Sequence, residues 1–103
     1  MNSNTFAINT HTQNVNEDIE ITAVSFRSQR SSHELESFPR RMLWEGREYD
    51  FIESGMQYLV KNGQHIVRLF DVSDGFANYR LRFDPEASRW TLLSIKDTPQ
   101  LAY

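Results

Sequence analysis

Residues 65–84 read HIVRLFDVSDGFANYRLRFD, and this stretch decides the fold. Apolar and polar side chains alternate on both sides of Asp74 and Gly75, as in two antiparallel strands joined by a two-residue turn. That turn gives four cross-strand pairs on one face: Val72 with Ala77, Phe70 with Tyr79, Arg68 with Leu81, and Ile66 with Phe83. Seven of these eight residues are apolar, so we expect this face to be buried and the other face to be mostly solvated. A turn two residues longer would keep the same faces, whereas a slip of one residue would expose the apolar set.

The dipeptide Glu45-Gly46 predicts a second hairpin, between residues 41–44 and 47–52. If these two residues form the turn, the cross-strand pairs are Trp44 with Arg47, Met42 with Tyr49, and Arg41 with Asp50. The last of these pairs joins opposite charges across the two strands. A three-residue loop with Gly46 in the left-handed region is an equally good interpretation.

Two further turn signals place the other strands of the C-terminal half. Asn62-Gly63 is the strongest short hairpin signal in the chain and predicts that a strand at residues 57–61 turns there. Asp84-Pro85 has Asp first and Pro second, as a type I turn prefers, and it precedes a last strand at residues 89–95.

The N-terminal half carries weaker signals. Residues 19–27 predict a first strand with apolar side chains on both faces, which indicates a central strand or a bulge in its middle. Residues 28–37 are polar and predict a long loop, with one helical turn at residues 32–35 as an option. Residues 1–17 are rich in Asn, Thr and Gln, so we expect a disordered tail, with an edge strand at residues 6–8 as the alternative.

These segments predict one domain of the all-β class at residues 18–97, between the tail at residues 1–17 and a short tail at residues 98–103. We expect a small antiparallel twisted sheet or a partly open barrel of about five to seven strands. Aromatic residues make up 13% of the chain, so bulky rings should dominate the core. The expected core residues are Met42, Tyr49, Phe51, Ile66, Phe70, Val72, Tyr79, Leu81, Phe83, Trp90 and Leu92.

The composition argues against several functions. The chain has no cysteine, which excludes disulfides and thiolate chemistry. Its three histidines have no metal-ligand spacing, and neither a nucleophile elbow nor a Gly-rich phosphate loop is present. We therefore expect a protein that is not an enzyme and uses no cofactor or metal. Since no apolar stretch approaches the length of a membrane span and no secretory signal is visible, we expect a cytoplasmic protein without membrane contact.

Arginine and aromatic side chains form the best candidate binding set. Nine of the eleven basic residues are Arg, whose planar group pairs with phosphate while aromatic rings stack on bases. The candidate residues are Trp44, Arg47, Tyr58, Arg80 and Arg82. A solvated sheet face is the simpler interpretation of the same residues, because the net charge is −3 and acidic residues lie nearby in the sequence.

Several of these segments together resemble a group of small uncharacterised bacterial β domains. The resemblance covers about residues 38–96 and rests on four stretches: WEGREY at 44–49, FDV at 70–72 followed by Asp74-Gly75, YRL at 79–81 followed by Phe83-Asp84, and WTL at 90–92. Some of these domains are encoded near DNA-repair polymerases, so the resemblance implies a β fold and adds some weight to nucleic-acid binding. This chain departs from the pattern in having no Trp at residues 56–60 and in being acidic overall.

The function that we expect is therefore that of a non-catalytic binding or interaction module with a protein partner. An exposed edge strand can accept an added strand from that partner, or it can pair with a second copy of the domain. The alternative is the binding of single-stranded nucleic acid on the sheet face that carries Arg80 and Arg82.

Overall fold

The computed structural model describes residues 11–28 and 35–97, which form seven antiparallel strands in one sheet and contain no helix. The strands are β1 (Thr12–Ser28), β2 (Leu35–Trp44), β3 (Arg47–Asp50), β4 (Glu53–Asn62), β5 (His65–Ser73), β6 (Ala77–Asp84) and β7 (Arg89–Asp97). The predicted all-β class is therefore confirmed. The C-terminal tail at residues 98–103 and the edge strand considered at residues 6–8 lie outside the described residues.

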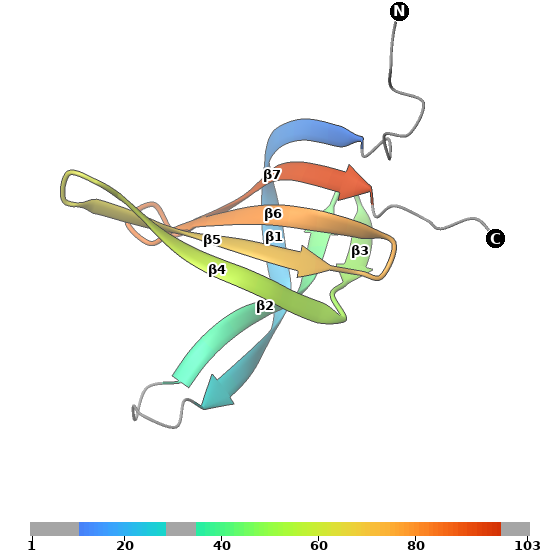
Figure 1. Cartoon of the computed structure of the whole chain (residues 1–103), viewed down its shortest axis with the longest axis horizontal. Helices are drawn as coiled ribbons and strands as arrows, with labels where there is room; N and C mark the ends of the chain where they lie inside the picture. Colours follow the sequence, from blue (N-terminus) through green and yellow to red (C-terminus); the bar gives the residue numbers. More distant parts are fainter. Residues whose placement is uncertain (1–10, 29–34, 98–103) are drawn as a thin grey trace, which may run out of the picture.

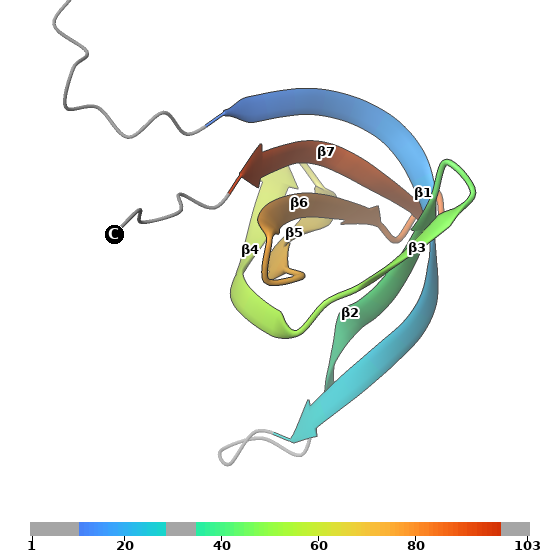
Figure 2. The ribbon, with the colours of Figure 1, turned by 90° about the vertical axis from the view of Figure 1, so that its right-hand side faces the viewer.

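The strand order is β3-β2-β1-β7-β6-β5-β4 (Figure 1). Strands that are consecutive in the chain pair with each other, except β3 and β4, and β1 also pairs with β7. Within the described part of the chain, the two free edges of the sheet are β3 and β4, which follow each other directly in the sequence. Phe51 and Ile52 join these edges: the amide of Phe51 donates to the carbonyl of Arg40, and that of Ile52 to the carbonyl of Ser73, both at 2.8 Å. The sheet curls strongly around its core without closing into a barrel (Figure 2).

Strand β1 is long, and its two halves pair with different strands. Residues 12–19 pair with β7 and residues 20–28 pair with β2, and the register shifts between Ile21 and Val24. β1 is therefore both central and bulged, the two interpretations that its two apolar faces allowed. Residues 12–17 were predicted to lie in the tail, and this prediction is wrong, because their backbone pairs with β7 and Val15 packs against the core. Backbone pairing compensates for their low apolar content.

The longer β2 also shortens the predicted loop. β2 begins at Leu35, opposite Ser28, and Phe38 lies in the core. Only residues 29–34 of the predicted loop remain, and these lie outside the described residues together with most of the helical turn considered at residues 32–35.

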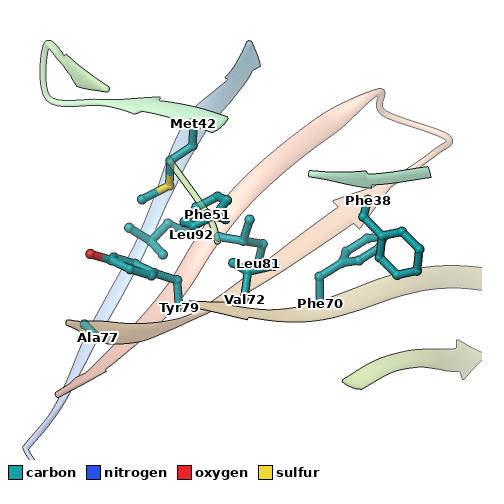
Figure 3. Packing of buried hydrophobic residues seen from close by; sticks show 9 residues of the cluster. All are labelled: Phe38, Met42, Phe51, Phe70, Val72, Ala77, Tyr79, Leu81 and Leu92. Atoms are coloured by element: carbon teal, nitrogen blue, oxygen red, sulfur yellow. The ribbon is translucent and has the colours of Figure 1, made fainter. Parts of the chain in front are cut away.

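The hydrophobic core lies between β2 on one side and β5, β6 and β7 on the other (Figure 3). Met42, Leu81 and Leu92 are fully buried. Tyr79 stacks obliquely on Phe51, with 5.5 Å between ring centroids. The predicted Tyr49, Phe83 and Trp90 are half-buried and pack against this cluster. Among the described residues, the buried members of this cluster are Phe38, Met42, Phe51, Phe70, Val72, Ala77, Tyr79, Leu81 and Leu92.

The register of the β5–β6 hairpin explains the one clear error in the predicted core. Phe70 pairs with Leu81, and Arg68 pairs with Phe83, two residues away from the predicted register. The faces are unchanged, as a shift of two residues requires. However, Ile66 now lies beyond the last pair with β6 and is 43% exposed instead of buried. Figure 1 shows the same feature as the projecting end of the β4–β5 hairpin.

Asp74 is the reason for the longer turn. Its carboxylate accepts hydrogen bonds from the amides of Phe76 and Ala77, at 2.8 and 2.9 Å, and from the hydroxyl of Tyr79 at 2.7 Å. These three bonds stabilise a loop that starts at Asp74 and ends where β6 begins, instead of a two-residue turn.

The other turns agree more closely with the sequence patterns. The β2–β3 hairpin has all three predicted pairs, with Glu45 and Gly46 at φ values of 52° and 75°, as a type I′ turn requires. The β4–β5 turn is displaced by one residue: Asn62 pairs with His65, so the turn residues are Gly63 and Gln64.

Candidate interaction surfaces

The five predicted binding residues lie in two separate groups. Tyr58, Arg80 and Arg82 belong to β4 and β6, on the face of the sheet opposite the core, here called the outer face. Trp44 and Arg47 form the last pair of the β2–β3 hairpin, and Trp44 packs against the core. The structure thus unites three of the five residues and separates the other two from them.

Arg80 and Tyr58 meet across Asp71 of β5. The guanidinium of Arg80 donates two hydrogen bonds to the Asp71 carboxylate, at 2.9 and 3.1 Å, and the Tyr58 hydroxyl donates a third at 3.2 Å. Arg80 also lies over the Tyr58 ring, 5.5 Å from its centroid. The hydrogen bonding of Arg80 to Asp71, followed by the charge of Asp71, raises the pKa of Arg80. The charge that a phosphate would need is therefore already balanced within the sheet.

A second polar cluster fixes the end of the β4–β5 hairpin. The ring of His65 lies between two carboxylates, with Nδ1 2.6 Å from Glu86 and Nε2 3.2 Å from Asp84. The hydrogen bond to Glu86 is the main cause that raises the pKa of His65; burial opposes it and the charge of Asp84 adds to it. Arg82 reaches the same Asp84 at 3.8 Å. This cluster joins the start of β5 to the turn that follows β6.

Trp44 and Arg47 lie at the turn of the β2–β3 hairpin. The indole nitrogen of Trp44 donates to Glu17 at 3.0 Å, and its ring lies 5.9 Å from that of Tyr49. The Trp44 ring is thus tied to β1 and to the core edge, so it does not form a free stacking platform beside Arg47.

The outer face also carries a shallow groove of about 520 Å³ over β1 and β4 to β7. Two cross-strand rows of polar residues form most of its floor. One row is Thr12, Lys96, Asn78, Ser73 and Glu53, and the other contains Ser94, Arg80 and Asp71. Each row mixes positive and negative charges, as expected for a solvated sheet face, and no single ligand chemistry is favoured.

The free edge of β4 differs from these polar surfaces. It spans ten residues, and its only charged residues are Glu53 and Lys61, near its two ends. Between them, the side chains of Met56, Leu59 and Val60 are exposed by 64%, 67% and 42%. Sequence reasoning predicted only a short strand at residues 57–61 and did not identify it as an edge, because strand order depends on the pairing of β1 with β7. The run of uncharged residues between Glu53 and Lys61 was the available signal.

Among residues 11–28 and 35–97, no group of three or more His, Asp or Glu side chains is arranged to hold a metal ion. No helix in this described part is long and apolar enough to cross a membrane. No protein-family model, curated protein or solved structure matches the chain, so the resemblance to small bacterial β domains stays a prediction.

Proposed function

We propose that this protein is a non-catalytic interaction module whose β4 edge takes up an extended segment of a protein partner. The observation that carries this proposal is the edge itself: β4 has ten residues and, among residues 11–28 and 35–97, no neighbouring strand on one side. Its middle is uncharged and carries exposed apolar side chains.

The physical basis is strand addition. An edge strand presents unpaired backbone amides and carbonyls, and an added strand satisfies them while its side chains pack beside those of the edge. Soluble proteins usually protect long edges with charges or bulges. β4 has one bulge, between Ser54 and Gln57, which leaves the regular part from Gln57 to Asn62 available for pairing.

The experiment is a selection of ten-residue peptides displayed against the immobilised full chain, followed by amide NMR with the selected peptides. We expect shift changes and slowed amide exchange along β4, with binding weakened at least about tenfold by Leu59→Lys. The matched control is Phe76→Lys, which adds the same charge at an exposed apolar residue outside β4 and should bind the same peptides. Peptides that bind only elsewhere, or equally well to Leu59→Lys, would contradict the proposal.

Single-stranded nucleic-acid binding is the second candidate, and the contact of Arg80 with the Tyr58 ring is the observation that favours it. Such binding would weaken steeply with salt, because phosphate contacts release counterions. It is tested by titrating a mixed oligonucleotide at low and moderate salt. If the Arg80→Ala, Arg82→Ala variant binds as well as the unmodified chain, the outer face is not a nucleic-acid surface.

A further inference from the structure

We propose that the extended segment taken up by β4 is β4 of a second copy of this chain, paired antiparallel across a twofold axis at Leu59. This inference rests on the proposed function of β4 as a binding edge and names its partner.

The distribution of charge along β4 is the first argument for a second copy. Glu53 and Lys61 have opposite charges and lie near opposite ends of the strand, with seven uncharged residues between them. Antiparallel pairing of two such strands reverses one of them, so no like charges face each other across the middle. A strand that carried charges in its middle would meet its own charge in the twofold arrangement.

The bulge in β4 decides which part can pair. The register with β5 is regular from Gln57 to Asn62 and irregular between Ser54 and Gln57, so a continuous ladder is confined to the regular part. A twofold axis normal to the sheet places the outer face of one copy beside the outer face of the other. Paired residues must therefore project from the same face of the sheet. Centring the axis at Leu59 uses residues 57–61 and leaves the bulge outside the ladder.

This register pairs side chains that suit each other. Leu59, 67% exposed in the single chain, meets Leu59 of the second copy at the axis. On each side of the axis, Tyr58 of one copy lies opposite Val60 of the other. Pairs of an aromatic and a β-branched residue stabilise antiparallel sheets. Gln57 faces Lys61 of the second copy, so the lysine meets an amide. Ile66, on the adjacent strand and on the face of Leu59, extends the apolar patch on both sides of the axis.

The absence of cysteine allows a direct test with the full chain. Leu59→Cys places two thiols at the axis, where paired Cα atoms are about 4.5–5.5 Å apart, within the range that a disulfide spans. Phe76→Cys is the matched control, an exposed apolar residue in the β5–β6 loop, outside the segment of residues 57–61 that would pair. Under mild oxidation we expect Leu59→Cys to form a covalent dimer at least about tenfold faster than Phe76→Cys.

Sedimentation equilibrium of the unmodified chain over a concentration series completes the test. We expect a monomer–dimer equilibrium that Leu59→Lys weakens at least about tenfold, because two ammonium groups would face each other, while Phe76→Lys leaves it unchanged. The proposal would be overturned by a chain that stays monomeric. It would also be overturned by a dimer that Leu59→Lys does not weaken and that Leu59→Cys does not cross-link faster than Phe76→Cys. The proposed function would survive that result if selected peptides still bind β4, and it would fail as well if they do not.

Discussion

The two free edges of the described sheet, β3 and β4, follow each other in the chain but differ in length and in charge. β3 has four residues, of which three are charged, whereas β4 has ten residues, with its charges near the ends. Both edges are attached to the same core through Phe51 and the paired strands β2 and β5. The same core therefore holds both edges in place. Whether an edge is available to a partner depends instead on the length of its strand and on the pattern of its side chains.

The largest effect is expected where the two edges join. Phe51 is 2% exposed and packs on Tyr79, while the next residue, Ile52, is 63% exposed. Phe51→Ala should reduce the free energy of unfolding by about 3–5 kcal/mol, because it leaves a cavity under the link between β3 and β4. Ile52→Ala is the adjacent control and should cost about 0.5 kcal/mol or less. Urea unfolding measures both, and equal losses would show that the link is not anchored through its buried ring.

The next effect concerns Asp74, whose loop sets the register of β5 and thus the position of the β4 edge. Burial alone would raise the pKa of Asp74, but hydrogen bonds from Tyr79 and from the amides of Phe76 and Ala77 outweigh it, so the pKa is lowered. A lowered folded-state pKa stabilises the fold above the unfolded value of about 3.9, and this contribution disappears as the pH falls through the folded value.

Replacement of Asp74 tests this pH dependence. Asp74→Ala should cost about 1–3 kcal/mol at neutral pH, since it leaves the loop amides and the Tyr79 hydroxyl without their acceptor. Asp74→Asn keeps an acceptor for the amides but cannot titrate, so its stability should fall less steeply between neutral pH and pH 3 than that of the unmodified chain. Urea midpoints over this pH range measure the difference, and parallel curves would rule out Asp74 as the source.

The comparison of the edges also shows how far the sequence could predict this molecule. Alternation and turn residues predicted the hairpins, their faces and the Arg41–Asp50 pair, because these depend on neighbours in the chain. They did not predict the two-residue shift in the register of β5 and β6. The longer turn depends on three hydrogen bonds that the Asp74 side chain accepts, and the pattern of residue types does not show these bonds. They also missed residues 12–17 in β1, whose place depends on pairing with β7 at the far end of the chain. The free edge at β4 follows from that same long-range pairing.

A smaller effect is expected at His65, which fixes the projecting end of the hairpin that carries β4. Its pKa is raised, first by the hydrogen bond to Glu86 and further by the charge of Asp84, while burial opposes both. A raised folded-state pKa stabilises the fold fully below the unfolded value of about 6.5, and the contribution is lost as the pH rises through the folded value. Glu86→Gln should lower the His65 pKa, as measured by NMR titration of the ring protons. Asp50→Asn, which changes the net charge equally but lies on β3, should leave it unchanged; an equal shift in both variants would point to net charge alone.

The smallest effect is expected at the β3 edge, and it decides why that edge differs from β4. Arg41 donates to Asp50 across β2 and β3, and the two side chains are 42% and 66% exposed, so water and salt screen the pair. Asp50→Ala should therefore leave the urea midpoint unchanged within error. Adding Asp50→Ala to the Leu59→Lys variant should also leave its oligomeric state unchanged, because a ladder of four residues is too short to hold two chains together even without that charge. If the double variant with Asp50→Ala and Leu59→Lys instead associates in sedimentation experiments, the charge of Asp50 protects β3 from pairing. The difference between the two edges would then lie in their side chains more than in their length.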